Sequence, residues 1–539
     1  MAAPLFKDYA TLRREFRWGL PARYNIGADV CDAWAKREPD RTAILRRLPG
    51  GGSERVSYGT LREASDRFAL ALRSLGVGKG DRVAILLPQS PAVVIAHLAT
   101  AKLGAISLPL AVLFGPDALA YRLRDSGAKV VLLDEGGLAK LGQIESDLPD
   151  LETLISVDGA GGGALDFSGL IAKVQGELTP VAPTPDDPAM MIYTSGTTGQ
   201  PKGAVHGHRV VPGHIPGLLF AHPGLGQSGD VMWTPADWAW AGGLLNVLLP
   251  SLALGVPVVA GLHAKFSVDQ VLALLRDLKV RNAFLPPTAL RMLQAAHRPG
   301  EVYRTHLRSI MSAGETLGPG TYEWAREAFG FPVNELYGQT ECNLVLGSSF
   351  QAGISRPGAI GKSVPGHEVE VQDEEGQVCA PGDIGEIVVK APDPVMFLNY
   401  WRNEKATAAK FREGWLLTGD KARRDEDGYL HFIGRSDDII TSAGYRIGPG
   451  EIEDCLMRHP AVAMAAVIGA ADTLRTEIVK AFLVLKPNFS PSAELTRDVQ
   501  LFVRERLSAH EYPRVIAYAD ALPMTSSGKI IRRALREGD

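Results

Sequence analysis

The 539-residue sequence predicts an α/β protein: a large N-terminal lobe of two doubly wound sheets plus a β subdomain, then a small, mobile α+β C-terminal lobe. Short apolar runs alternate with amphipathic segments along most of the chain, which is the spacing of βαβ units. Near residue 361 the pattern changes to short strands separated by glycine and proline, which indicates the β subdomain. A chain of this length is also too long for one compact core.

The first sheet is predicted from residues before 135. Thr60 is expected to cap an amphipathic helix that Gly76 ends. Residues 135–187 are weakly patterned, so only a lead-in to the next strand is expected there. The expected helices lie at 27–37, 60–75, 91–103 and 117–126, and the expected strands at 83–87, 106–110 and 130–133.

The second doubly wound unit follows the strand at 189–192. Its expected helices lie at 244–254, 268–278, 287–296 and 320–329, and its strands at 256–260, 282–285, 309–313 and 333–336. The β subdomain covers 361–390, with strands at 368–372 and 386–389.

A domain boundary is predicted near Arg435. The strand at 428–434 ends in glycine, and the residues after it are short and polar. We therefore predict one lobe at 1–434 and a second at 435–539, with a hinge near Asp437 that allows closure over a ligand. The small lobe is expected to contain helices at 449–458 and 493–507 and strands at 462–468 and 478–485.

Composition narrows the function class. A formal net charge of −4 argues against general nucleic-acid binding and favours small-molecule chemistry. The four cysteines, at 31, 342, 379 and 455, have no metal-ligand spacing, so free thiols in the cytoplasm are expected. No apolar run is long enough for a membrane span, and the N-terminus does not resemble a secretory signal. Whether the chain forms a homo-oligomer stays open.

A loop rich in glycine and hydroxyl side chains follows the strand at 189–192. Glycine lets the backbone approach a ligand closely, hydroxyl and N–H groups donate hydrogen bonds, and the lysine adds a positive charge. These features are typical of a phosphate cradle, although a flexible surface loop has a similar composition. The ordered strand before the loop favours the cradle, whose residues are Thr194, Ser195, Gly196, Thr197, Thr198, Gly199 and Lys202.

Three more polar stretches stand at predicted strand ends, where ligands bind in open α/β sheets: 312–316, 335–341 and 417–420. Glu341 is a candidate ligand for Mg²⁺, Asp420 a candidate partner of two ribose hydroxyls, and Tyr337 a candidate stacking ring. Each has an ordinary alternative: a solvated charge, a turn residue or core packing. Their joint occurrence beside a phosphate cradle argues for a site.

The small lobe adds Arg435, Arg446 and Lys529. Lys529 follows a glycine-bearing turn near the chain end, and one ammonium on such a loop suits stabilisation of charge on a reacting phosphoryl or carboxylate group. A lysine in a frayed tail is the ordinary alternative.

The ordered motifs together resemble the adenylate-forming superfamily of acyl-CoA synthetases, adenylation domains and luciferases. The resemblance covers nearly the whole chain and is closest to the acetyl-CoA and medium-chain acyl-CoA synthetase branch. It rests on the cradle, Tyr337–Glu341, Thr418–Asp420, Gly434–Asp438, Ser442–Arg446 and Ser527–Lys529, with Tyr24–Gly27 and Gly444–Pro449 indicating the branch.

The resemblance implies two half-reactions. A carboxylate attacks the α-phosphate of ATP with Mg²⁺, giving acyl-AMP and pyrophosphate, and the thiol of CoA then displaces AMP. For ATP, the resemblance implies that Thr194–Lys202 bind the β- and γ-phosphates, that Thr340 also contacts the α-phosphate, that Glu341 binds Mg²⁺ and that Asp420 and Arg435 bind ribose. The implied adenine pocket consists of Gly314, Glu315, Glu335, Tyr337, Gly338, Gln339 and Thr340. In the small lobe, Lys529 is implied as the catalytic lysine of adenylation, Arg446 as a phosphate contact, Asp437 as the hinge, and Ala443, Gly444 and Tyr445 as the CoA contacts.

The acyl pocket is the least specified part. Acetate-specific relatives carry a bulky tryptophan where this sequence has Gly338, so a longer chain or an aromatic ring is expected to fit. Trp238 and Trp240 are expected either to line the pocket or to pack in the core. Close relatives usually have serine at Ala443, so a backbone contact to CoA is expected there.

The sequence thus predicts a ligase joining a medium-chain or similar-sized acid to CoA. An aryl or branched acid is the alternative substrate, and a carrier protein the alternative acceptor. A nucleotide-binding regulatory protein without catalysis is a further alternative, against which the joint presence of Thr340, Glu341 and Lys529 argues.

Overall fold

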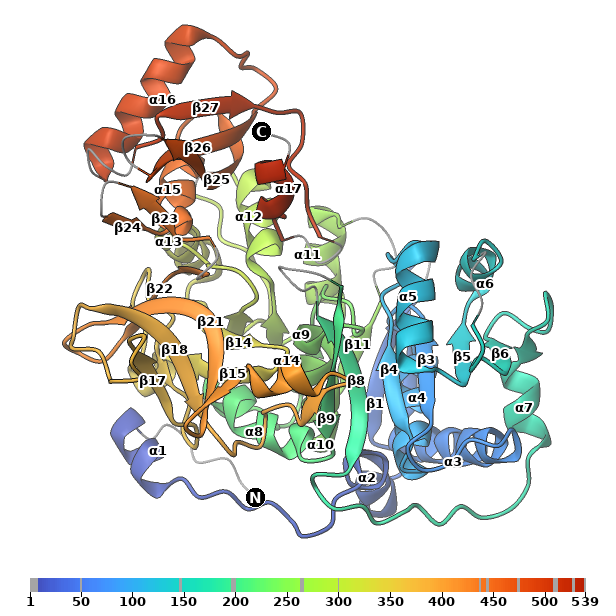
Figure 1. The fold of residues 1–539 in the computed structure, drawn as a ribbon. Coiled ribbons are helices and arrows are strands. Elements are labelled where there is room, and N and C mark those ends of the chain that lie inside the picture. Colours follow the sequence, from blue (N-terminus) through green and yellow to red (C-terminus); the bar gives the residue numbers. More distant parts are fainter. Residues whose placement is uncertain are drawn as a thin grey trace.

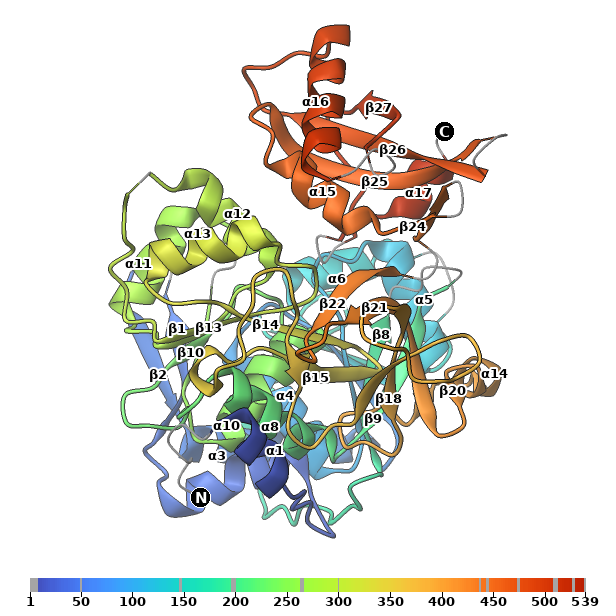
Figure 2. The same cartoon turned by 90° about the vertical axis from the view of Figure 1, so that its left-hand side faces the viewer.

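The computed structural model has a larger N-terminal domain and a smaller C-terminal domain, which confirms the predicted α/β fold class. Figures 1 and 2 show the smaller domain, orange to red, above the rest of the molecule. The structure describes residues 8–48, 51–144, 148–194, 200–261, 266–298, 300–435, 438–442, 445–472, 476–507, 512–525 and 529–537.

The first sheet has eight strands in the order β19-β9-β8-β4-β3-β5-β6-β7. Strands β8 to β7 in that order are parallel, and β9 and β19 add antiparallel pairs at one edge. The strands are β3 (Arg82–Leu86), β4 (Ile106–Pro109), β5 (Val130–Leu133), β6 (Thr153–Ser156), β7 (Leu165–Asp166), β8 (Pro188–Thr194), β9 (Lys202–Gly207) and β19 (Asn399–Tyr400).

Helix α3 (Tyr58–Ser74) leads into β3, and four helices connect later strands of this sheet: α4 (Pro91–Lys102), α5 (Pro116–Ser126), α6 (Glu135–Leu141) and α7 (Phe167–Lys173). Two expectations were wrong here. The side chain of Ser57, not Thr60, caps α3 by accepting from the Thr60 N–H. Residues 135–187 are more than a lead-in, because they supply α6, β6, β7 and α7 and extend the sheet.

The second sheet has nine strands in the order β16-β15-β14-β13-β12-β10-β11-β1-β2. Its N-terminal strand β1 pairs in parallel with β11, so the chain starts in the second sheet before building the first. The strands are β1 (Thr42–Arg47), β2 (Ser53–Ser57), β10 (Met232–Trp233), β11 (Val258–Ala260), β12 (Asn282–Phe284), β13 (Ser309–Ser312), β14 (Asn334–Gln339), β15 (Cys342–Gly347) and β16 (Lys362–Ser363).

The remaining helices of the large domain begin with α1 (Tyr9–Glu15) and α2 (Ala33–Arg37), which follows a π-helical turn at Ala28–Asp32. The long apolar helix expected at 244–254 is a composite, because a π-helical turn at Leu244–Leu248 separates α9 (Ala241–Gly243) from α10 (Leu249–Ala253). The others are α8 (Val210–Ala221), α11 (Val268–Asp277), α12 (Pro287–Ala296), α13 (Pro319–Phe329) and α14 (Glu404–Ala408).

The predicted β subdomain is an antiparallel sheet in the order β17-β18-β21-β20, with β22 paired to β21. Its strands are β17 (Val369–Gln372), β18 (Ile384–Lys390), β20 (Phe411–Arg412), β21 (Trp415–Arg424) and β22 (Leu430–Arg435). In Figure 1 this sheet lies beside β14 and β15 of the second sheet. The β21–β22 hairpin has a turn end, where Arg424 pairs with Leu430, and an open end, where Asp420 pairs with Arg435.

The small domain is built on β26, which pairs with β23, β25 and β27. Its elements are β23 (Ile440–Ser442), β24 (Tyr445–Ile447), α15 (Pro449–Met457), β25 (Val462–Asp472), β26 (Thr476–Leu485), α16 (Ala493–Arg506), β27 (Val515–Tyr518) and α17 (Arg532–Glu537). The two predicted helices and two predicted strands of this lobe are all present.

The four cysteines are free thiols, as predicted. In the part of the chain that the structure describes, no helix is long and apolar enough to cross a bilayer.

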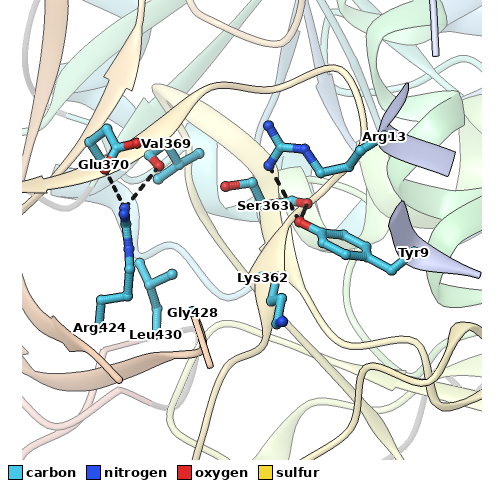
Figure 3. Close-up of a pocket in the computed structure, with 9 residues that line it drawn as sticks. All are labelled: Tyr9, Arg13, Lys362, Ser363, Val369, Glu370, Arg424, Gly428 and Leu430. Atoms are coloured by element: carbon cyan, nitrogen blue, oxygen red, sulfur yellow. Dashed lines mark hydrogen bonds and ion pairs between the residues drawn. The ribbon is translucent and has the colours of Figure 1, made fainter. Parts of the chain in front are cut away.

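A pocket of about 150 Å³ lies between α1 and the turn end of the β21–β22 hairpin (Figure 3). Tyr9 of α1 donates to the Ser363 carbonyl at 2.8 Å, and Arg424 forms an ion pair with Glu370 on the other side. The first contact joins the N-terminal helix to β16 of the second sheet, and the second lies within the β subdomain. The predicted ligand-binding residues Asp420 and Arg435 stand at the other end of the hairpin, so this pocket is separate from them.

Candidate active site

The open end of the β21–β22 hairpin meets the end of β14. The Asp420 carboxylate accepts hydrogen bonds from the Tyr337 hydroxyl at 2.7 Å and from Nε2 of Gln339 at 2.6 Å. Its other oxygen lies 3.5 Å from the Arg435 guanidinium, across the strand pair. The structure therefore brings together four residues that the sequence separates by up to about a hundred positions.

Local backbone geometry fixes this carboxylate. Gly419 has φ of 76°, which favours glycine, and its N–H donates to the Glu386 carboxylate at 2.7 Å. The Asp420 N–H donates to the Thr418 hydroxyl, which in turn donates to the Ile387 carbonyl at 2.6 Å. Asp420 is only 5% exposed, and burial raises the pKa of its carboxyl although Arg435 acts in the opposite direction.

Tyr337 combines a half-buried ring with a fixed hydroxyl. The ring lies 6.4 Å from the Phe432 ring at 40°, and burial raises the pKa of its hydroxyl. This hydroxyl is therefore a neutral donor to Asp420, and the ring is held in one orientation. A ring positioned in this way is suited to stacking on a planar ligand.

A second cluster links the cradle to Glu341. The Tyr400 hydroxyl donates to Oε1 of Glu341, and the Lys202 ammonium lies 5.3 Å from the centroid of the Tyr400 ring. Glu341 is 8% exposed, and it forms no ion pair with any residue that the structure describes. A nearly buried carboxylate without a cationic partner is suited to binding a cation.

Two antiparallel strands flank the cradle. Thr194, at the end of β8, pairs with Lys202, at the start of β9. The predicted strand before the cradle is confirmed, and the antiparallel strand β9 follows the cradle. The cradle residues Ser195, Gly196, Thr197, Thr198 and Gly199 lie outside the described residues.

Thr340 and Glu341 form the tight turn that joins β14 to β15, because Gln339 pairs directly with Cys342. The turn places both residues at the tip of one hairpin. A Cβ on Gly338 would lie 2.5 Å from the Leu344 backbone nitrogen. Glycine is thus needed here for the approach of two strands, a structural role separate from the predicted one in pocket size.

Gly314 and Glu315 follow β13, on the far side of β14. Gly314 has φ of 100°, and the Glu315 carboxylate accepts from the Thr288 hydroxyl at 2.8 Å and pairs with Arg291 at 2.9 Å. Glu315 therefore has its charge balanced within the large domain and its orientation fixed.

Glu335, near the start of β14, is 8% exposed and accepts from the Leu317 N–H at 3.1 Å. Burial raises the pKa of its carboxyl to about 7. The carboxylate of Asp454, on α15 of the small domain, raises this pKa further, whereas Arg291 lowers it. The charge of Glu335 is therefore sensitive to both domains.

The two tryptophans differ in their surroundings. Trp238 is 1% exposed within the main hydrophobic core, whereas Trp240 is half-buried and packs edge-on against Phe114 at 5.6 Å. Their proposed part in the acyl pocket stays a prediction.

Of the predicted residues of the small domain, Lys529 is described and exposed. Tyr445 and Arg446 lie on β24, but their side chains are outside the description. Asp437, Ala443 and Gly444 lie outside the described residues altogether.

Sequence reasoning missed Tyr400, Glu386 and Arg291. Tyr400 lies in a two-residue strand after an apolar run, and nothing in that run marks its pairing with Glu341. Glu386 lay inside a correctly predicted strand, where an outward-facing charge is ordinary. The alternation of side chains along β18 could have shown which face of the sheet Glu386 lies on, but not that the Gly419 N–H would donate a hydrogen bond to it.

Comparisons with known proteins cover most of the chain. Residues 31–401 match the AMP-binding enzyme family, and residues 451–529 match the AMP-binding enzyme C-terminal domain. The chain is 34% identical to the human mitochondrial acyl-coenzyme A synthetase ACSM2B over 97% of this chain and 92% of that one. It is 32% identical to the acetyl-coenzyme A synthetase of Bacillus subtilis (strain 168), over 98% and 95%.

A solved structure also superposes on most of the chain. The anthranilate CoA ligase AuaEII, in complex with anthranoyl-AMP, gives a TM-score of 0.85 at 30% identity, covering 96% of this chain and 98% of that one.

Proposed function

Since the chain belongs to the AMP-binding enzyme family and is an ATP-dependent acid–CoA ligase, we propose that it activates a medium-chain or similar-sized carboxylate. The reaction proceeds through acyl-AMP, which CoA then converts to the thioester.

The assignment of residues to ribose and adenine rests on the cluster around Asp420. In it one buried carboxylate, one arginine, one amide and one aromatic ring face each other at the junction of β14 and the β subdomain. Charge-assisted hydrogen bonds from two vicinal hydroxyls suit such a carboxylate. We assign Asp420 and Arg435 to ribose, and Tyr337 to the adenine face.

In the first half-reaction two anions meet, so the protein must stabilise negative charge. The cradle, Thr194–Lys202, is assigned to the β- and γ-phosphates, with Lys202 on the leaving pyrophosphate. Thr340, at the hairpin tip, is assigned as a contact of the α-phosphate and the acyl carboxylate. Lys529 is assigned as the catalytic cation at the carboxylate, with Arg446 as a further phosphate contact.

Glu341 is assigned to Mg²⁺. No group of three or more acidic, histidine or cysteine side chains that would hold a metal ion occurs among the described residues, so a closed protein cage is not available there. Glu341, a nearly buried carboxylate without an ion pair to any described residue, fits the mode in which Mg²⁺ uses few protein ligands and several phosphate oxygens. The ion would neutralise phosphate charge when bound, and Tyr400 orients the carboxylate that would hold it.

For the second half-reaction we propose that residues 435–539 rotate relative to 1–434 about Asp437. The β23–β24 segment with Ala443, Gly444 and Tyr445 is then assigned to CoA. A cytoplasmic location stays a prediction, and whether the chain forms a homo-oligomer stays open.

The substrate proposal rests on the names of the relatives and on Gly338, which stands where acetate-specific relatives carry a bulky tryptophan. A relative at 34% identity is named an acyl-coenzyme A synthetase, and a structural neighbour is named an anthranilate CoA ligase. An aryl or branched acid is therefore the alternative substrate.

The test is a pyrophosphate-release screen over linear C2–C12 acids and aromatic acids, with and without CoA. The proposal predicts release with middle-length acids and a CoA thioester as product. Preference for aromatic acids would select the alternative substrate. Acid-dependent pyrophosphate exchange without any CoA thioester would refute the choice of CoA in favour of a carrier protein, and no release with any acid would refute the activity.

A further inference from the structure

A closed cluster of two carboxylates and two guanidinium groups joins three segments of the small domain. Arg532, on α17, contacts both carboxylate oxygens of Glu453, on α15, at 2.7 Å. Arg532 also lies 3.4 Å from Asp438, and Arg536 lies 2.9 Å from the other oxygen of Asp438. We call these four residues the hinge cluster, because Asp438 directly follows the predicted hinge residue Asp437.

The hinge cluster is charge-balanced and poorly accessible. The side chains of Asp438, Glu453 and Arg532 are 11%, 15% and 20% exposed. Glu453 also accepts from the Val467 N–H at 2.8 Å, and Arg532 donates to the Val467 carbonyl at 3.2 Å. Bidentate and shared hydrogen bonds of this kind fix the relative positions of the segments they join.

Lys529 stands three residues before Arg532, and hydrogen bonds hold its own backbone in place. The Thr525 N–H donates to the Lys529 carbonyl at 2.7 Å, and the Lys529 N–H donates to the Thr525 hydroxyl at 3.0 Å. The Ile531 N–H donates to the Pro523 carbonyl at 2.8 Å. The side chain of Lys529 is exposed, so its base is anchored while its ammonium stays available.

These contacts make one rigid connection from the residue after the hinge to the base of Lys529. We propose that Arg532 and Asp438 are positioning residues for adenylation: they convert rotation at the hinge into a defined position of Lys529. The inference rests on the proposed function of Lys529. A lysine reaching across from another domain depends on such positioning, because a misplacement of about 1 Å can lower a rate about 100-fold.

The test uses the full-length enzyme and two conservative variants, Arg532→Lys and Asp438→Asn. Acid-dependent exchange of pyrophosphate with ATP reports adenylation, and thioester formation from supplied acyl-AMP and CoA reports the second step. We expect exchange to fall about 10- to 100-fold in kcat for both variants. The KM for ATP and the second step should change by less than about 3-fold, because other residues carry them.

Arg533→Ala is the matched control. Arg533 lies next to Arg532 on the same helix, but its side chain is 59% exposed and forms an ion pair with Glu537, which is also exposed. This variant should retain wild-type rates in both steps.

Three results would overturn the inference. The first is an equal loss of both steps, with a lowered Tm, which would make the cluster merely structural. The second is wild-type exchange in both variants. The third is a loss in Arg533→Ala as large as in Arg532→Lys. If Asp438→Asn does not fold, Arg532→Lys, which keeps the charge opposite Glu453, decides alone. A wild-type enzyme without exchange would instead refute the proposed function.

Discussion

Replacing Asp420 with asparagine should weaken the use of ATP far more than the stability of the protein. The carboxylate holds Tyr337, Gln339 and Arg435 in place, and an amide of the same shape can keep at most part of these contacts. Its NH₂ group would face either the Arg435 guanidinium or the two donors at Oδ2. Burial raises the pKa of Asp420, so its charge is costly in the free enzyme and its removal spares the fold.

The size of the effect follows from these contacts. A hydrogen bond to a charged group contributes about 1.5–3 kcal/mol, against about 1 kcal/mol for a neutral pair. Losing the charge at two ribose hydroxyls, together with the orientation of Arg435, should therefore cost about 2–4 kcal/mol of transition-state binding. At about 1.4 kcal/mol for each factor of ten, kcat/KM for ATP should fall about 30- to 1,000-fold.

The assay is pyrophosphate exchange at saturating acid with ATP varied, alongside a thermal melt. Asp425→Asn is the control. Asp425 also accepts several hydrogen bonds, from Arg356, Tyr429 and His431, but toward the turn end of the same hairpin. It should lower Tm without changing kcat/KM for ATP. A fall of less than about 3-fold in folded Asp420→Asn would refute the ribose assignment.

Three further predictions concern other groups of the site. Lys529→Ala should abolish acyl-AMP formation but spare thioester formation from supplied acyl-AMP; equal loss of both steps would contradict its role. The pKa of Glu335 is raised from 4.5 to about 7, so its contribution to stability is full below about pH 4.5 and is lost as the pH rises through about 7. Relative to wild type, Glu335→Gln should therefore gain about 3 kcal/mol in the free energy of unfolding between about pH 5 and 8, measured by denaturant titration; a pH-independent difference would contradict this. Tyr400→Phe should raise the Mg²⁺ concentration for half-maximal exchange several-fold, because Glu341 loses its orienting donor. An unchanged Mg²⁺ titration would remove Tyr400 from the site.

The elements that sequence predicted well are those with strong apolar periodicity. The helix at Pro287–Ala296 and the strand at Val130–Leu133 have the predicted bounds, because proline or buried β-branched residues define them locally. The position of β1 beside β11 had no such local signal. Sheet order depends on long-range pairing, which periodicity does not encode.

In the candidate site too, residue types could be predicted from the sequence but long-range contacts could not. The residue types at Asp420, Arg435 and Tyr337 were recognisable as motif members, but their mutual contacts depend on how the β subdomain packs against β14. Tyr400 could not be assigned, because its relevance comes from one hydrogen bond to Glu341 made by a two-residue strand. Single partners of this kind become visible only when distant segments are placed together.

The contact between the domains links the charge of Glu335 to domain orientation. Both carboxylate oxygens of Asp454 lie 3.0 Å from where a Cβ on Gly318 would be, at the N-terminal end of α13. A carboxylate is favoured there, since the helix dipole makes that end positive. Leu317, the residue before Gly318, donates to Glu335, whose pKa Asp454 raises. If the small domain rotates as proposed, Asp454 leaves this position, the helix end loses its anion, and Glu335 ionises more readily. Domain orientation and the electrostatics of the proposed adenine pocket are thereby coupled through one carboxylate on α15.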